Sequence, residues 1–153
     1  MDAAIVDVLG EPYRSETIEF PPDSEGAVVA TLVSRRAGAR TGHAVLYLHG
    51  FCDYFFQTNL ADFYVERGYD FYALDLRKYG RSLREHHTPN FCTDLADYFP
   101  ELDEALRLMR ERDGQSHVLV NGHSTGALIG AIWADARRAR GTPVAEGFVM
   151  NSP

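Results

Sequence analysis

The stretch from Val118 to Ile129 constrains the fold of this chain more than any other. It reads V-L-V-N-G-H-S-T-G-A-L-I, an apolar strand-like run that meets a G-x-S-x-G and passes into a helix of small residues. A tight turn between a buried strand and a helix exposes the serine Oγ beside the first N–H groups of the helix. Gly122 and Gly126 suit such a turn, because strand and helix approach too closely for a Cβ atom. The pattern predicts a nucleophile at Ser124; the alternative is a glycine-rich turn capped by a serine.

Two further motifs lie upstream in a fixed order. Residues 44–48, A-V-L-Y-L, read as a buried strand that runs into His49, Gly50 and Phe51, and residues 75–82, D-L-R-K-Y-G-R-S, follow the next strand-like run. In this order and spacing, the chain resembles the α/β-hydrolase superfamily. Within it, the chain is most similar to enzymes of the monoacylglycerol lipase, lysophospholipase and serine aminopeptidase type. The similarity extends from about the first strand to Pro153.

The resemblance assigns a role to each motif. It implies that Ser124 attacks an acyl carbonyl, and that the backbone N–H groups of Phe51 and Thr125 form the oxyanion hole. The remaining motif residues are expected to shape the site rather than to react: His49 and Gly50 in the oxyanion loop, Asp75 holding the loop that follows it, and Gly122, His123 and Gly126 around the serine.

The length of the chain conflicts with a complete enzyme of this type. The resemblance implies an eight-stranded, mostly parallel sheet, whereas 153 residues end after a sixth predicted strand, Gly147 to Asn151. Residues 1–153 are therefore expected to be the N-terminal part of a single α/β-hydrolase domain, with the lid and the C-terminal strands absent. The acid and the histidine of the triad come after the serine in this family. We expect them outside this chain, in a C-terminal part that acts as its partner.

None of the histidines within the chain is well placed as a base for Ser124. His123 is adjacent to the serine in a tight turn, so its side chain should point elsewhere. His86 and His87 are adjacent in the sequence and cannot both face one metal ion from a helix, so no metal site is expected. Asp75, at the carboxyl end of a strand, is the best candidate within the chain for the acidic residue of a triad, although the resemblance assigns it to holding the following loop. The other histidines are expected in loops or at the far ends of strands: His43, His49, His86, His87 and His117.

The pattern of apolar residues predicts an α/β fold, a doubly wound and mostly parallel sheet preceded by an antiparallel hairpin. The hairpin is expected to have one solvated face, with a turn over residues 21–26, whereas short continuous apolar runs suit central parallel strands covered on both sides. The predicted strands are 16–20, 27–33, 45–48, 71–74, 118–120 and 148–150. Helices are predicted over 59–67, over 95–112 with a kink or a fresh start at Pro100, and over 125–140.

The charge and the cysteine content limit the possible partners and the cellular location to a modest degree. Fifteen basic and 22 acidic residues give a net charge of −7, which argues against a nucleic-acid partner. Residues 1–12 lack the features of a secretory signal, and no apolar run is long enough to span a membrane. Cys52 and Cys92 suit a reducing cytoplasm, although a bond between them or a reactive thiol remains open. No cofactor is expected.

Two functions from different classes follow. The first is a serine hydrolase of carboxylic esters, active only together with its C-terminal part. The second is a noncatalytic α/β binding or interaction module, which would have to explain an apolar last strand with an open edge. The aromatic stretch of Phe51, Tyr54, Phe55 and Phe56 suggests an apolar acyl site, or simply aromatic packing under a loop. A dehalogenase is disfavoured, because its chemistry needs an aspartate at the position of Ser124.

Overall fold

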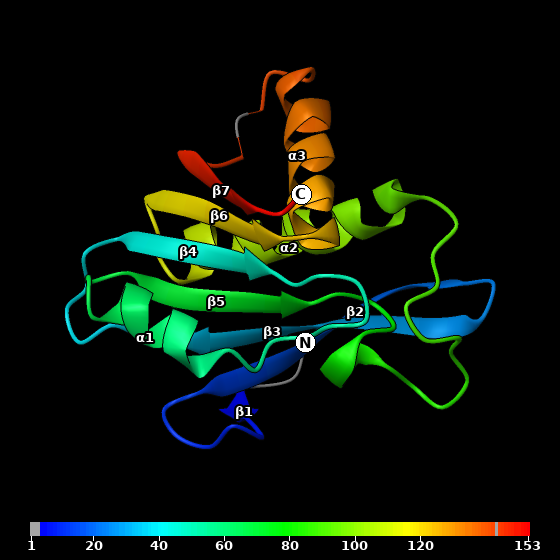
Figure 1. Cartoon of the computed structure of the whole chain (residues 1–153), viewed down its shortest axis with the longest axis horizontal. Helices are drawn as coiled ribbons and strands as arrows, with labels where there is room; N and C mark the ends of the chain where they lie inside the picture. Colours follow the sequence, from blue (N-terminus) through cyan, green and yellow to red (C-terminus); the bar gives the residue numbers. More distant parts are fainter. Residues whose placement is uncertain (1–3, 143) are drawn as a thin grey trace.

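The computed structural model describes residues 4–142 and 144–153 as a 7-stranded sheet with helices on both faces (Figure 1). Residues 1–3, which open the stretch expected to lack a signal, and Pro143 lie outside the described residues. The strands lie in the order β1-β2-β3-β5-β4-β6-β7. The elements are β1 (Ile5–Val6), β2 (Arg14–Asp23), β3 (Gly26–Arg35), β4 (His43–Leu48), α1 (Thr58–Val65), β5 (Asp70–Asp75), η1 (Gly80–Ser82), η2 (Leu95–Tyr98), α2 (Phe99–Arg107), η3 (Leu108–Arg112), β6 (His117–His123), α3 (Thr125–Arg138) and β7 (Gly147–Asn151).

The sheet is parallel where the motifs lie. Strands β5, β4, β6 and β7 are parallel neighbours, whereas β1, β2 and β3 pair antiparallel and β3 joins β5 antiparallel. Leu48 lies opposite Leu74 on one side and Gly122 on the other. The carboxyl ends of β4, β5 and β6 therefore meet at one edge of the sheet, called the carboxyl edge below. The predicted doubly wound fold is confirmed.

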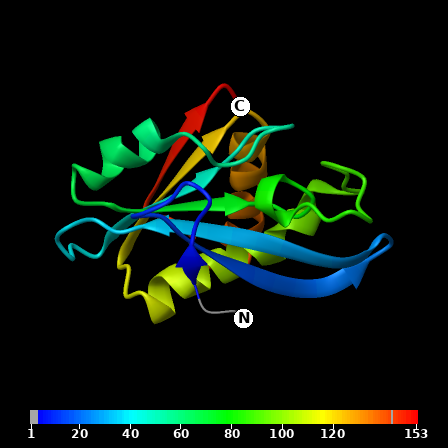
Figure 2. The same ribbon diagram turned by 90° about the horizontal axis from the view of Figure 1, so that it is seen from below.

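Alternate residues along the central strands supply two cores. Leu46 of β4 belongs to a cluster with Leu102 of α2 and Trp133 of α3. Its neighbour Val45 faces the other way and packs in a cluster with Ala61 and Tyr64 of α1. This alternation follows from the period of two in a strand. Figure 2 shows α1 and α2 on opposite sides of the sheet.

The three predicted helices are present, and the middle one begins afresh at the proline. A short 3₁₀ turn, η2, precedes α2, and Pro100 occupies the first turn of α2. Proline fits there because its missing N–H has no partner in a first turn in any case. The last turn widens into a π-helix, η3, before the chain reverses at Gly114, whose φ is +76°.

The N-terminal region differs from the prediction in two respects. Strand β1 was not predicted, because two exposed residues are too short to show an alternating pattern. The hairpin turn is tighter than the expected 21–26, since β2 runs through a bulge to Asp23 and β3 starts at Gly26. The expected single solvated face holds only for β2. Residues 28–33 of β3 are all buried, because both faces of β3 are covered: Leu32 packs in the cluster with Leu102, and Val33 packs in the cluster with Tyr64.

Strand β7, drawn red in Figure 1, forms the far edge of the sheet. It pairs with β6, and its residues Phe148, Val149 and Met150 keep 37%, 45% and 53% of their surface exposed. An apolar edge strand that is exposed in this way favours pairing with further chain.

Candidate active site

Ser124 stands at a sharp turn on the carboxyl edge. Strand β6 ends at His123 and α3 begins at Thr125, so that Ser124 alone makes the turn, with φ 51° and ψ −123°. A residue with a side chain pays about 1–3 kcal/mol for such a conformation, which persists only where the surroundings enforce it. Here Ser124 N–H donates to Asn151 O at 2.8 Å, and Ala127 N–H donates to Ser124 O at 2.9 Å.

The two glycines of the G-x-S-x-G are required by close approach. A Cβ atom on Gly122 would lie 2.4 Å from Ala127 Cα, and one on Gly126 would lie 2.4 Å from the carbonyl oxygens of both Leu48 and His49. No real Cβ atom is accommodated at that distance from backbone. The first turn of α3 is therefore pressed against the ends of β4 and β6, as the sequence predicted.

The loop after β4 lies beside Ser124. A Cβ atom on Gly50 would lie 3.3 Å from Ser124 Cβ, which places the H-G-F segment next to the serine. Among the described residues, no acceptor receives a hydrogen bond from the N–H of Phe51 or of Thr125. Two unpaired backbone donors thus flank the turn, as an oxyanion hole requires; their catalytic role stays a prediction.

His49 holds this loop and is not available as a base. Its buried ring accepts a hydrogen bond from Leu76 N–H at Nε2 (3.1 Å), and its Nδ1 lies 2.9 Å from Gly50 O. Because Nε2 accepts, Nδ1 carries the proton and donates to the carbonyl. Burial lowers the pKa of the imidazole, and the ring packs on Tyr79 at 4.7 Å between centroids. His49 is thus a neutral link between β4 and β5.

Asp75 organises the carboxyl edge from the end of β5. Its fully buried carboxylate accepts from Phe55 N–H (2.9 Å), from Arg81 N–H (3.0 Å) and from Arg81 Nη1 (2.9 Å). These three hydrogen bonds tie the carboxylate to the loops after β4 and β5, and none of its partners in the described part of the chain is a histidine. The geometry agrees with the predicted role of Asp75, which is to hold the following loop.

The remaining histidines lie away from the serine hydroxyl. His43 and His117 begin β4 and β6, with their rings 5.0 Å apart at the opposite edge of the sheet. His86 Nε2 and His87 Nε2 lie 3.0 Å and 2.9 Å from the carbonyl of Ala27. Within residues 4–142 and 144–153, no side chain is hydrogen-bonded to Ser124 Oγ.

His123 lines a cavity of about 680 Å³ on the α1 face, and its ring also adjoins the loop after β4, since a Cβ atom on Gly50 would lie 3.2 Å from His123 Cδ2. Asn121, from the same strand, also faces this cavity and donates to the hydroxyl of Tyr64 at 3.0 Å. The cavity is bounded by α1, by the loop before it and by β7. Its further lining is Tyr47, Asp53, Phe56, Gln57, Asn59, Leu60, Val149, Met150 and Asn151.

The aromatic stretch after Gly50 divides into one packed and three exposed side chains. Phe55 is fully buried, whereas Phe51, Tyr54 and Phe56 are 61%, 43% and 52% exposed. Aromatic packing under the loop therefore accounts for Phe55 alone. Cys52, in the same loop, is a free thiol that accepts a hydrogen bond from Asn90 Nδ2 at 3.3 Å; Cys92 is also free.

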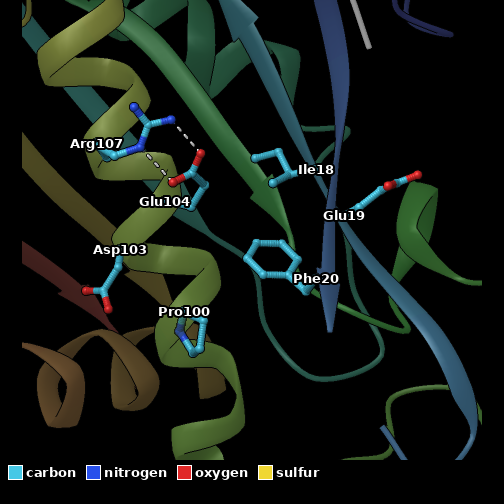
Figure 3. Close-up of a pocket in the computed structure, with 7 residues that line it drawn as sticks. All are labelled: Ile18, Glu19, Phe20, Pro100, Asp103, Glu104 and Arg107. Atoms are coloured by element: carbon cyan, nitrogen blue, oxygen red, sulfur yellow. Dashed lines mark hydrogen bonds and ion pairs between the residues drawn. The ribbon is translucent and has the colours of Figure 1, made fainter. Parts of the chain in front are cut away.

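A second cavity lies between β2 and α2 and has no nucleophile (Figure 3). Its volume is about 620 Å³, and its charged lining is largely consumed by the Glu104–Arg107 pair, with contacts of 2.8 and 2.7 Å. The other side chains drawn in Figure 3 are Ile18, Glu19, Phe20, Pro100 and Asp103.

The described ranges contain neither a metal-binding cluster nor a membrane-spanning helix. No group of three or more His, Cys, Asp or Glu side chains is placed to hold a metal ion there. None of the helices in the described part is both long and apolar enough to cross a bilayer.

The sequence matches the family described as "Serine aminopeptidase, S33" over residues 39–153. The chain belongs to this family. No curated relative matches it. The match includes the three motifs and begins after β3, so that β1, β2 and β3 lie outside it.

Solved structures of hydrolases share the fold. The chain superposes with a TM-score of 0.72 on a carboxyl esterase from Bacillus coagulans, at 14% identity, covering 89% of this chain and 43% of the esterase. A monoglyceride lipase from Saccharomyces cerevisiae gives 0.66 at 19% identity, with coverages of 88% and 43%. An α/β hydrolase from Penicillium sp. sh18 gives 0.65 at 18% identity, with coverages of 89% and 45%. The chain thus has the α/β-hydrolase fold and spans less than half the length of these structures.

Sequence reasoning missed the residues that support the loop after β4 from a distance. Arg81 was part of the D-L-R-K-Y-G-R-S motif but was assigned no role, and Asp7 was not singled out. Arg81 donates to Asp7 at 2.7 Å. The position of Arg81 within the motif could have drawn attention to it, whereas nothing in the neighbouring sequence identifies Asp7 as its partner.

Proposed function

We propose that this chain carries the nucleophile and the oxyanion hole of a serine hydrolase that acts on carboxylic esters. The observation that carries the proposal is the strained Ser124 turn, with φ 51° and ψ −123°, beside the H-G-F loop. A turn of this kind, called a nucleophile elbow, presents the serine Oγ to a bound carbonyl. Membership of the serine aminopeptidase family and the esterase and lipase folds among its structural neighbours support this assignment.

In the proposed reaction, Ser124 Oγ forms a bond to the acyl carbon as its proton passes to a base. The carbonyl oxygen becomes an oxyanion that accepts hydrogen bonds from the N–H groups of Phe51 and Thr125. Collapse of the tetrahedral intermediate expels the alcohol, which takes the proton from the base, and water then releases the acid from the acyl-enzyme. Each backbone donor stabilises the transition state by about 3 kcal/mol.

We infer that the base comes from outside the described residues, because none of their side chains is hydrogen-bonded to Ser124 Oγ. His49 uses both ring nitrogens within the loop, and His123 faces the cavity on the α1 side. We propose that residues 1–153 are the N-terminal part of one α/β-hydrolase domain and that its C-terminal part supplies a histidine and an acid. The exposed apolar strand β7 is the proposed contact with that part, and it argues against a self-sufficient noncatalytic module.

Labelling with a fluorophosphonate tests the proposal. The probe is reacted with the 153-residue chain and with a longer gene product that includes the C-terminal part, and the labelled peptide is mapped by mass spectrometry. We expect modification of Ser124 in the longer protein and at least about hundredfold slower modification in the shorter chain, because the general base is missing. Ser124→Ala should abolish labelling, whereas Ser152→Ala, at an exposed serine, should not. Labelling that survives in Ser124→Ala would refute the assignment.

A further inference from the structure

Arg81 lies at the centre of a buried charge network that joins the N-terminal segment (residues 5–13) to the loop after β4. Its guanidinium makes a two-pronged contact with Asp7, Nε to Oδ2 and Nη2 to Oδ1, both at 2.7 Å. Its third nitrogen, Nη1, donates to Asp75 Oδ2 and to Phe55 O, both at 2.9 Å. The side chain of Arg81 is 11% exposed, and those of Asp7 and Asp75 are 1% and 0% exposed.

Phe55 is the point at which this network reaches the candidate oxyanion hole. Its N–H donates to Asp75 and its carbonyl accepts from Arg81, so both of its backbone polar groups are fixed by members of the network. Its buried ring packs on Tyr13 of the N-terminal segment, with centroids 5.9 Å apart. Only residues 52–54 separate Phe55 from Phe51, whose N–H is the proposed oxyanion donor.

The N-terminal segment presents Asp7 in a fixed position. Asp7 N–H donates to Tyr13 O at 3.0 Å, Gly10 N–H donates to Asp7 O at 2.8 Å, and Leu9 N–H donates to Asp7 Oδ1 at 3.1 Å. Burial alone would raise the pKa of the Asp7 carboxyl, but the hydrogen bonds from Arg81 and Leu9 outweigh it and the pKa lies below its ordinary value. Asp7 is therefore a charged acceptor in the folded protein.

Asp7 sets the direction of the Arg81 fork. A guanidinium donates through a rigid plane, so the contact that holds Nε and Nη2 also determines where Nη1 points. With Asp7 in place, Nη1 meets the carbonyl of Phe55. Without it, Arg81 would retain only Asp75 as a charged partner, and the carbonyl of Phe55 would lose its orienting donor.

We propose that Asp7 is a positioning residue for the oxyanion loop: by fixing the plane of Arg81, it holds Phe55 and thereby the backbone N–H of Phe51 beside Ser124. The role of that N–H rests on the proposed function, whereas the mechanical link from Asp7 to the loop does not. Asp7 precedes the region that matches the family, residues 39–153. The N-terminal segment is thus a part of the site that the shared motifs do not specify.

Amide hydrogen exchange tests the link independently of catalysis. In Asp7→Asn, an NH₂ group replaces one acceptor oxygen and meets an N–H of Arg81, so one prong of the contact is lost. We expect the amides of residues 51–56 to exchange at least about tenfold faster in the variant, because local opening of the loop becomes easier. Amides in β4 and β6 should be unchanged. Unchanged exchange over residues 51–56 would overturn the proposal.

A matched pair elsewhere in the chain provides the control. Arg112 also makes a two-pronged contact, from Nη1 and Nη2 to the buried Glu16 at 2.7 and 2.9 Å, and this contact is not part of the network around Phe55. Glu16→Gln should destabilise the chain without faster exchange at residues 51–56. An equal acceleration in Glu16→Gln would show that general loss of stability is the cause, and would overturn the specific role of Asp7.

A second variant keeps the proposal testable if Asp7→Asn does not fold. Arg81→Lys retains a positive charge between Asp7 and Asp75 but loses the fork that reaches Phe55 O. It should accelerate exchange over residues 51–56 in the same way. In the Arg81→Lys background, Asp7→Asn should add little, since residues that act through one contact are not additive. Fully additive effects would refute action through Arg81.

Kinetics separate this role from a purely structural one. With p-nitrophenyl acetate and the longer, base-containing protein, Asp7→Asn should lower kcat by about tenfold to hundredfold, because misplacement of a transition-state donor acts on the chemical step. KM should stay within about twofold, and Glu16→Gln should leave kcat unchanged. If the unsubstituted protein has no esterase activity, the proposed function fails and the exchange experiment still decides the link. A rise in KM with unchanged kcat would overturn the positioning role.

Discussion

The backbone N–H of Ser124 donates a 2.8 Å hydrogen bond to the carbonyl oxygen of Asn151. This bond continues the parallel pairing of β6 with β7, in which His123 lies opposite Asn151. The last residue of the edge strand therefore helps to hold the strained turn. Strand β7 is at once the most exposed strand of the parallel part of the sheet and a support of the candidate nucleophile.

The exposed edge of β7 is expected to drive self-association of the 153-residue chain. Val149→Lys places a charge on this apolar strand, and a charged edge opposes edge-to-edge pairing. The apparent mass from light scattering should fall toward that of a monomer, while the free energy of unfolding changes by no more than about 0.5 kcal/mol, because Val149 is 45% exposed. Val8→Lys adds the same charge at a side chain that is 85% exposed outside the strands, and should not alter the mass. Equal effects of the two variants would contradict the role of the edge.

The conformation of Ser124 predicts opposite outcomes for activity and stability. The free energy of unfolding of Ser124→Gly should be about 1 kcal/mol higher than that of Ser124→Ala. Glycine relieves about 1–3 kcal/mol of backbone strain in the folded state, whereas its greater freedom in the unfolded chain costs about 0.5–1 kcal/mol of stability. Both variants should lose fluorophosphonate labelling. Urea unfolding of the two proteins checks the difference, and equal midpoints would show that the turn is not strained.

Close packing at the start of α3 predicts that Gly126→Ala is strongly destabilising. The new methyl group would lie 2.4 Å from the carbonyl oxygens of Leu48 and His49, which are backbone atoms that cannot turn aside. We expect a loss of more than about 3 kcal/mol, or no folded protein. Gly130→Ala on the same helix meets the side-chain end of Leu48 at 3.2 Å. Its cost should be offset by the helix propensity of alanine, about 1 kcal/mol. Calorimetry that ranked the two variants equally would contradict this account.

What could be predicted from the sequence depends on how locally each feature is determined. The Ser124 turn and the close contact of Gly126 depend on neighbouring strand and helix signals, so a short window of sequence predicts them. The contact of Arg81 with Asp7 joins residues 74 positions apart, and neither residue type reveals its partner. Strand β3 was expected to have one solvated face, because it was predicted as part of an antiparallel hairpin at the edge of the sheet. Both of its faces are buried by the layers packed on the sheet, over Leu32 on one side and Val33 on the other, and this is a property of the whole fold.

The buried imidazole of His49 predicts that the chain loses stability as the pH falls below about 6.5. Because burial disfavours the cation, the pKa of His49 lies below its ordinary value of 6.5, and its Nε2 is already occupied as the acceptor from Leu76 N–H. The unfolded chain then binds a proton that the folded chain excludes, so the stabilisation is present above pH 6.5 and is lost toward the folded-state pKa, with a slope of at most about 1.4 kcal/mol per pH unit.

Glu101, whose pKa burial raises to about 7, contributes the opposite slope, since its folded form takes up a proton. The measurement is therefore the difference in unfolding free energy between the unsubstituted chain and His49→Gln from pH 5 to 8, in which the Glu101 contribution cancels. This difference should shrink as the pH falls. A His49→Gln difference that is constant with pH would mean that the ring is protonated in place and does not hold the loop as a neutral acceptor.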